Sequence, residues 1–205
     1  MGSFFYMRCC KAITRWISRA PIYNYLFFFN LANNLQKFVA SFIDFPKLIF
    51  ALVNGPSVGI MVTILGLCDV VYATRDATFV TPFSLLGQSP EGCSSYTFPR
   101  LMNRGKAMEM ICFNKRISAS EAESMGLVTR VFDRSCFMTE TELLLKSYSE
   151  LPIGSLIAAK KLIRKAESEA LHRANKSEVE ELRSRWGSEE CLQAVLNFFQ
   201  RKAKL

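Results

Sequence analysis

The stretch from Leu48 to Cys68, LIFALVNGPSVGIMVTILGLC, contains no charged residue and decides the fold. Its length would suit a membrane helix, but the turn signal Asn54-Gly55-Pro56 lies in its middle, and a proline there would break a spanning helix. The stretch therefore predicts a buried strand at 48–53, a turn, and a buried helix at about 58–67. We expect no membrane span in this part of the chain.

Short β-branched runs follow at 70–73 and 78–80 and predict two further strands. A strand, a helix and a strand in this order form a right-handed crossover, which builds a parallel sheet flanked by helices. The predicted fold class is therefore α/β. Ser118 to Glu121 has the spacing of a helix capping box, so we expect a helix that ends at Gly126 and then a strand at 127–132.

The chain becomes helical and charged after Leu151-Pro152. Helices are expected at 156–169, at 177–185 and from Ser188 onward. The last of these has an apolar stripe that is typical of a helix docking on a surface. The stripe consists of Leu192, Val195, Leu196 and Phe199.

Composition limits the class of function. The net charge of +8 is spread over the 205 residues, which favours an anionic small ligand over nucleic acid. The seven cysteines show no C-x-x-C pair and no regular spacing, which argues against a metal site and against a disulfide framework. A reducing, intracellular setting is the simpler interpretation. Half of the residues are hydrophobic, enough for one domain with a sizeable core.

The N-terminal part differs in character from the rest. No acidic residue occurs from Met1 to Ile43, and several basic residues precede an aromatic run at 25–29. This pattern vaguely resembles a presequence or signal peptide, but the run is short and no small-residue cleavage site follows it, so we expect no cleavage. We divide the chain into a divergent N-terminal segment (1–33), an α/β core (34–150) and a C-terminal helical region (151–205).

A lone carboxylate, Glu91, lies in the turn Gln-Ser-Pro-Glu-Gly at 88–92. Glu91 is a candidate proton shuttle, and the chain around Gly59 opens a helix whose free backbone N–H groups can stabilise an oxyanion. Such a turn is by itself usually a solvated surface loop, and Gly59 can equally serve close helix packing. The pairing suggests proton transfer beside a carbonyl. We expect His172 to face solvent and Cys93 to be a small packed residue, and neither receives a catalytic role.

Four runs carry a resemblance to a known family: Phe42 to Lys47, Val53 to Pro56, Leu86 to Tyr96 and Ala122 to Val128. Through them and the last helix the chain resembles, from about Asn33 to Leu205, the enoyl-CoA hydratase/isomerase (crotonase) superfamily. Within it the chain is most similar to the peroxisomal enoyl-CoA delta isomerases. The resemblance implies a partial crotonase (ClpP/crotonase-like) fold, with parallel-sheet ββα units and C-terminal helices.

The resemblance also separates two reaction types. Hydratases of this superfamily add water with two glutamates, and the matching positions here are Thr63 and Phe83, neither of which can activate water. Isomerases carry a single catalytic base at the position of Glu91. The resemblance further implies that the N–H of Ile60, just after Gly59, is one of two oxyanion donors. The implied substrate is an acyl-CoA, with no metal or redox cofactor, and the implied assembly is a homo- or hetero-trimer.

The sequence departs from the family before Phe38. Members carry there the first strands of the core and a loop that supplies the other oxyanion N–H, and nothing in residues 1–37 matches them. The chain is therefore interpreted as N-terminally truncated. Two main hypotheses follow: an active isomerase with Glu91 as acid/base, or an inactive homologue that binds acyl-CoA or associates with full-length subunits. A third is a membrane protein anchored through the aromatic run at 25–29.

The C-terminal tripeptide Ala203-Lys204-Leu205 is a one-residue variant of the peroxisomal address Ser-Lys-Leu. We therefore expect a peroxisomal import receptor as a partner and the peroxisome as the compartment. The mitochondrion and the cytoplasm are the alternatives.

Overall fold

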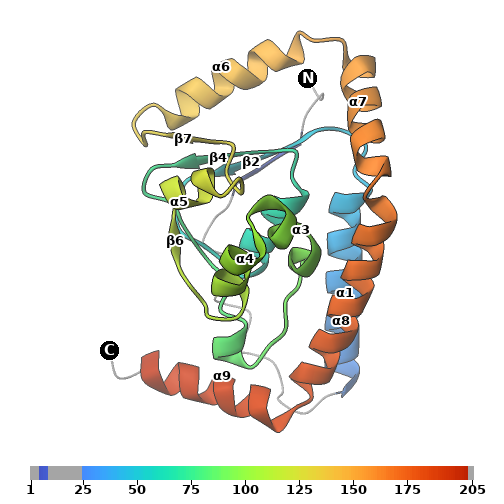
Figure 1. Cartoon of the computed structure of the whole chain (residues 1–205), viewed down its shortest axis with the longest axis vertical. Coiled ribbons are helices and arrows are strands. Elements are labelled where there is room, and N and C mark those ends of the chain that lie inside the picture. Colours follow the sequence, from blue (N-terminus) through green and yellow to red (C-terminus); the bar gives the residue numbers. More distant parts are fainter. Residues whose placement is uncertain (1–4, 9–24, 203–205) are drawn as a thin grey trace.

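A four-stranded parallel sheet lies at the centre of the computed structural model, which describes residues 5–8 and 25–202 (Figure 1). Every neighbouring pair of strands in it is parallel, which confirms the α/β class. A smaller three-stranded sheet lies beside it. In order, the larger sheet contains β1 (Phe5–Arg8), β2 (Ile49–Val53), β4 (Val70–Thr74) and β7 (Arg130–Phe132), and the smaller one β3 (Ser57–Val58), β5 (Thr78–Val80) and β6 (Ile117–Ser118).

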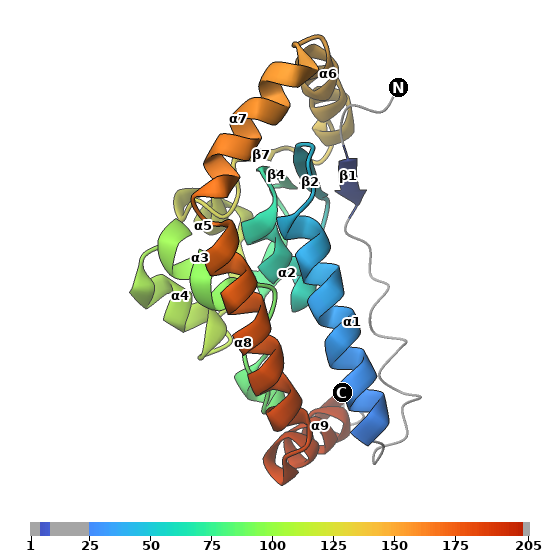
Figure 2. The same ribbon diagram turned by 90° about the vertical axis from the view of Figure 1, so that its right-hand side faces the viewer.

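Helices surround both sheets. Two long ones, α1 (Tyr25–Ile43) and α8 (Ser168–Trp186), lie side by side along one flank, with α7 (Ile153–Lys165) above them and α9 (Glu189–Lys202) turning away below (Figure 2). The other helices are α2 (Ile60–Thr63), which continues as the 3₁₀ helix η3 (Ile64–Leu67), η4 (Ser84–Leu86), α3 (Ser94–Leu101), α4 (Arg104–Ile111), α5 (Ala119–Ser124) and α6 (Phe137–Ser149).

The uncharged stretch forms the strand and the turn that the sequence predicts. Every residue of β2 is buried, with Phe50 and Leu52 packed on the α6 side and Ala51 and Val53 packed in the main core on the other face. A parallel strand covered on both faces needs apolar residues at every position, which explains why the stretch does not alternate. Among residues 25–202, no helix is long and apolar enough to cross a membrane.

The predicted helix at 58–67 begins later than expected. Val58 belongs to strand β3 and pairs with Val80, and α2 starts only at Ile60. The residue between them, Gly59, has φ 63° and ψ −130°, a conformation open to glycine that interrupts any helix. The helix also tightens to 3₁₀ geometry from Ile64.

Local signals predict the later elements well where turn chemistry is specific. Ser118 and Glu121 form the capping box of α5, and Gly126 ends the helix with φ 83°. The strand after it is shorter than predicted, because only 130–132 pair with β4. Helix α6 was not predicted. The predicted helices at 156–169 and 177–185 are wrong in their division, because α7 ends at Lys165 and α8 begins at Ser168 and runs unbroken through 170–176.

The N-terminal part contributes a strand that the sequence analysis did not predict. Strand β1 pairs in parallel with β2, with Phe5 opposite Ile49. Helix α1 begins at the aromatic run and continues through the proposed boundary between residues 33 and 34. The three-part division of the chain stays a prediction, and the tripeptide 203–205 lies outside the described residues.

A buried ion pair attaches the C-terminal helices to the sheet. The Lys160 ammonium on α7 donates to Asp69 Oδ2 at 2.7 Å and to the carbonyl of Lys47 at 2.6 Å. The same Asp69 oxygen accepts the N–H of Ile49, the first residue of β2, and Arg164 lies 3.6 Å from the other oxygen. The Lys160 side chain is almost fully enclosed, so these contacts replace its hydration.

We expect Lys160→Met to lower the free energy of unfolding by about 3 kcal/mol, because it leaves a buried carboxylate without its closest cation. Urea denaturation at neutral pH measures this difference. The matched control is Lys161→Met, since Lys161 is exposed on the same helix and its loss should change stability by less than about 0.5 kcal/mol. Equal unfolding free energies for the two variants would contradict the structural role of Lys160.

Candidate active site

Glu91 lies in the turn that connects η4 to the start of α3. The two residues after it, Gly92 and Cys93, both have left-handed backbone conformations, with φ 68° and 61°. The carbonyl of Glu91 accepts hydrogen bonds from the N–H and the hydroxyl of Ser94, at 3.2 and 2.7 Å. These contacts fix the backbone of the turn immediately before the first turn of α3.

Gly92 brings this turn against the start of α2. A Cβ atom at Gly92 would lie only 2.4 Å from the hydroxyl oxygen of Thr63 and 3.2 Å from the Cδ1 atom of Ile60. Only a residue without a side chain allows this approach. The structure therefore packs the turn that carries Glu91 against α2, the helix that opens at the predicted oxyanion segment, although 32 positions separate Gly59 from Glu91 in the sequence.

The two predicted oxyanion residues differ in their hydrogen bonds. The N–H of Gly59 donates to the carbonyl of Val80 at 2.9 Å and is not available to a ligand. The N–H of Ile60 has no acceptor among the described residues, because it opens α2. A Cβ atom at Gly59 would meet no atom of the described part of the chain within 4 Å. Ile60 is thus the candidate donor, and Gly59 supplies the turn that exposes it.

Burial raises the pKa of the Glu91 carboxyl to about 7, and the negative charge of Glu178 adds to the effect. Glu178 lies on α8, is only 6% exposed, and accepts the N–H groups of Cys93 and Ser95 at 2.7 and 2.8 Å. Burial raises the pKa of Glu178 too, while its bonds to Ser95 and Cys93 act in the opposite direction. One carboxylate thus lies in the turn, and a second one binds the backbone that follows it.

Glu178 is not among the residues predicted from the sequence, although a signal for it exists. The buried residues of α8 recur at helical spacing, and Glu178 falls on that stripe. The sequence predicts two separate helices, at 156–169 and 177–185, so the buried residues before and after 176 were not recognised as one stripe. It consists of Leu171, Asn175, Glu178, Val179 and Leu182.

The remaining predicted residues lie as follows. Thr63 and Phe83 are both buried, and the Thr63 hydroxyl donates to the carbonyl of Ile60 at 3.2 Å. Cys93 is fully buried, and burial raises the pKa of its thiol to about 12, which confirms a packed residue. His172 is half-exposed and contacts Asp44 Oδ1 at 2.8 Å. Within the described residues, no three His, Cys, Asp or Glu side chains cluster to hold a metal ion.

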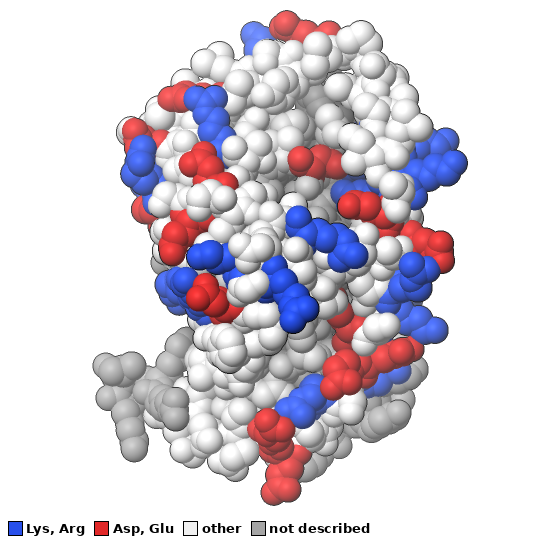
Figure 3. Space-filling model, viewed as in Figure 1, with Lys and Arg blue, Asp and Glu red and all other residues white. Residues whose placement is uncertain are grey.

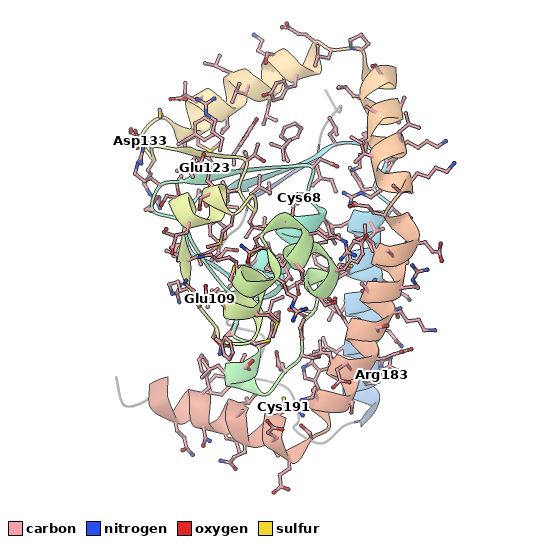
Figure 4. The ribbon with its side chains drawn as sticks, viewed as in Figure 1. Cys68, Glu109, Glu123, Asp133, Arg183 and Cys191 are labelled. Atoms are coloured by element: carbon pink, nitrogen blue, oxygen red, sulfur yellow. The ribbon has the colours of Figure 1, made fainter. Side chains whose placement is uncertain are left out.

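Residues at the corner between α8 and α9 contact Leu86 and Gly87, at the start of the segment 86–95 that contains Glu91. Arg185 Nε donates to the carbonyl of Gly87 at 3.0 Å, and Cys191 Sγ lies 3.3 Å from the carbonyl of Leu86. A Cβ atom at Gly87 would lie 2.8 Å from the Cα atom of Cys191. Cys191 lies at the start of α9 (Figure 4). The last helix therefore docks beside the site through its first turn, whereas Leu196 and Phe199 of its apolar stripe remain exposed.

Charges on the face that carries α3 and α4 are mixed in sign (Figure 3). Lysine and arginine side chains alternate there with acidic ones. This pattern agrees with a net charge spread over the chain and not with the continuous basic surface of a nucleic-acid-binding protein.

A parallel sheet flanked by helices, with one carboxylate turn packed against the start of a helix, defines this chain as a crotonase-fold protein. A solved enoyl-CoA hydratase/isomerase from Pseudoalteromonas atlantica T6c matches it with a TM-score of 0.78 and 31% sequence identity, over 80% of this chain and 66% of that one. The sequence profile of the enoyl-CoA hydratase/isomerase family matches residues 28–204. The chain belongs to the enoyl-CoA hydratase/isomerase family.

Within the family, the chain is similar to delta isomerases. It is 57% identical to enoyl-CoA delta isomerase 2 of Rattus norvegicus over 171 residues, which are 83% of this chain and 44% of the relative. It is 50% identical to enoyl-CoA delta isomerase 3, peroxisomal, of Mus musculus over 170 residues, 83% of this chain and 54% of the relative. The chain thus spans about half the length of the curated relatives it matches.

We expect Gly92→Ala to destabilise the protein by about 1–3 kcal/mol, because it adds backbone strain at positive φ and a clash with Thr63. Thermal unfolding with a fitted free energy measures the change. The control is Gly154→Ala in α7, where an added Cβ meets nothing within 4 Å and helix propensity predicts unchanged or slightly higher stability. A Gly92→Ala protein as stable as the wild type would refute the close contact between the two segments.

Proposed function

We propose that this protein is an enoyl-CoA delta isomerase, which shifts the double bond of an unsaturated fatty acyl-CoA from position 3 to position 2 in beta-oxidation. One observation carries the proposal. The desolvated Glu91 carboxyl lies in a turn packed against the start of α2, where the N–H of Ile60 has no acceptor among the described residues. The similarity to delta isomerases at 50–57% identity supports the same assignment.

In the proposed reaction, Glu91 acts as the single acid/base. The ionised carboxylate removes a proton from C2, and the electrons of the broken C–H bond spread over the double bond to the thioester oxygen. The resulting dienolate oxygen accepts the N–H of Ile60. Glu91 then returns the proton to C4, which leaves the double bond at position 2. A pKa of about 7 suits a group that must both take up and release one proton at neutral pH.

The residues at the hydratase positions support isomerisation over hydration. Addition of water needs a group that activates the water, and the enclosed Thr63 and Phe83 side chains carry no carboxylate. The Thr63 hydroxyl is also occupied, since it donates to the carbonyl of Ile60. Glu178 does not replace a second catalytic glutamate, because both of its oxygens accept backbone N–H groups.

We also propose the partners and the compartment that fit this activity. Coenzyme A is part of the substrate, its phosphates suit a chain of net charge +8, and the reaction requires no further cofactor. One relative at 50% identity is named peroxisomal, and the tripeptide Ala203-Lys204-Leu205 suits recognition by a peroxisomal import receptor. Assembly into homo- or hetero-trimers with family members belongs to the same proposal.

We expect Glu91→Gln to lower the turnover of a 3-enoyl-CoA by about a hundred- to ten-thousandfold, because the amide cannot accept the C2 proton. The conjugated thioester absorbance of the 2-enoyl product provides the assay. The matched control is Glu109→Gln, a carboxylate on α4 that pairs with Lys115 at the surface and should leave turnover unchanged. Background rates from both the folded wild type and Glu91→Gln would refute the isomerase proposal. Saturable coenzyme A binding by that wild type would then favour an inactive acyl-CoA-binding homologue.

The pH dependence follows from the same carboxyl. Because Glu91 must be ionised to accept a proton and its pKa is raised to about 7, kcat/KM should fall about tenfold per unit as pH drops below 7. Above that pH the carboxylate is fully ionised, and kcat/KM should level off. Initial rates from pH 5 to 9 measure the profile. An acid limb near the ordinary glutamate pKa would show that another group, or an exposed Glu91, limits the reaction.

A further inference from the structure

Both carboxylate oxygens of Glu178 bind the backbone that follows Glu91. Oε2 accepts the N–H of Cys93 at 2.7 Å, and Oε1 accepts the N–H of Ser95 at 2.8 Å. The two N–H groups lie on either side of Ser94, the first residue of α3, and Glu178 reaches them from α8. Helices α3 and α8 lie next to each other (Figure 2). A single side chain from the C-terminal part thus holds the turn of the proposed base.

A buried carboxylate that accepts these two hydrogen bonds costs free energy, because its charge loses hydration. Helix starts are usually capped by a neutral serine, threonine or asparagine, or by an aspartate, at the N-cap position itself, yet Cys93 at that position forms no side-chain cap. The cap comes instead from a distant carboxylate that is only 6% exposed, and burial of a carboxylate is costly. The position of this charge therefore points to a role beyond satisfying two N–H groups.

We propose that Glu178 is a positioning residue for the Glu91 base: its carboxylate fixes the backbone of the turn, and its negative charge strengthens Glu91 as a base. The inference rests on the proposed function, in which Glu91 carries the proton. Glu178 does not touch the substrate in this scheme, because it is enclosed and its oxygens are occupied by Cys93 and Ser95.

The hydrogen bonds indicate that Glu178 is the ionised member of the pair. Two backbone N–H donors and the N-terminal end of α3 stabilise a carboxylate more than a carboxylic acid. Among the described residues, the influences on the Glu91 carboxyl are desolvation and the like charge of Glu178, and both favour its protonated form. As the pH rises, Glu178 should therefore lose its proton before Glu91 does.

Few other charges act on this pair. Cys93 is in the turn itself and its thiol is neutral, since burial raises its pKa to about 12. On α7, Arg164 acts on that thiol but binds Asp69 and the carbonyl of Leu67. On α8, His172 contacts Asp44, and Arg183 donates to Asn33 on α1. Arg183 lies near the end of α8 and Cys191 lies at the start of α9 (Figure 4).

The test is a carbon-13 NMR titration of the protein labelled at its glutamate carboxyls, with the Glu91 signal assigned by its loss in Glu91→Gln. In the wild type we expect Glu91 to titrate near pH 7. Burial raises the pKa of Glu178 as well, but its bonds to Ser95 and Cys93 act in the opposite direction, so we expect Glu178 to lose its proton first. In Glu178→Gln, the Glu91 midpoint should fall by about half a unit to one unit, because burial, the larger cause of the shift, remains. The acid limb of kcat/KM should move by the same amount.

Two further variants separate charge from shape. Glu180→Gln removes an exposed carboxylate from the same helix and should leave the Glu91 midpoint in place. Glu178→Asp keeps the charge but shortens the reach to Cys93 and Ser95, so the midpoint should stay near the wild-type value while kcat falls. An unchanged Glu91 midpoint in Glu178→Gln would overturn the proposal and leave Glu178 as a structural cap.

The outcomes also distinguish this proposal from the proposed function. The titration needs no turnover, so a wild type without isomerase activity would refute the proposed function while the midpoints still decide whether Glu178 acts on Glu91. If Glu178→Gln does not fold, the wild-type titration decides the electrostatic part alone. If Glu178 is still protonated at the pH at which Glu91 titrates, the electrostatic part of the proposal is overturned.

Discussion

The contact between Gly92 and Thr63 is the constraint on which the candidate site depends. The absence of a side chain at Gly92 lets the turn that carries Glu91 approach the start of α2, where any added Cβ would overlap the Thr63 hydroxyl. The same glycine adopts a left-handed conformation that turns the chain toward α3. The turn that carries the desolvated Glu91 carboxyl and the helix that opens with the Ile60 N–H, which has no acceptor among the described residues, pack together through this single steric condition.

The C-terminal helices are part of this site. The segment from Leu86 to Ser95 is held at its start by Arg185 and Cys191 and at its end by Glu178. Lys160 in turn fixes α7 to the first residue of β2 through Asp69. Loss of α7–α9 would therefore expose core residues and also release the turn of the proposed base at both ends.

Features that depend on neighbouring residues could be predicted from the sequence, and features that depend on tertiary contacts could not. Strand β2 and the capping box at Ser118 follow from burial pattern and turn chemistry over a few positions. Strand β1 has no such pattern, and only its pairing with β2 defines it. The turn at 88–92 made Glu91 a candidate proton shuttle, but only the family resemblance favoured that role over a solvated surface loop. Glu178 requires knowledge that α8 is continuous and that its buried face meets the start of α3.

Glu91 and Glu178 have the same side chain, but their surroundings favour different protonation states. A carboxylate that exchanges protons with a substrate needs an oxygen free of strong donors and a proton affinity close to the working pH, and Glu91 meets the second condition through desolvation and a like charge. A carboxylate that only provides the charge must stay ionised, and the two N–H bonds of Glu178 favour that state. If both groups had the same surroundings, one proton would be shared between them and neither would be a defined base. The asymmetry of their hydrogen bonds therefore favours Glu91, and not Glu178, as the proposed acid/base, in keeping with a single proton shuttle between C2 and C4.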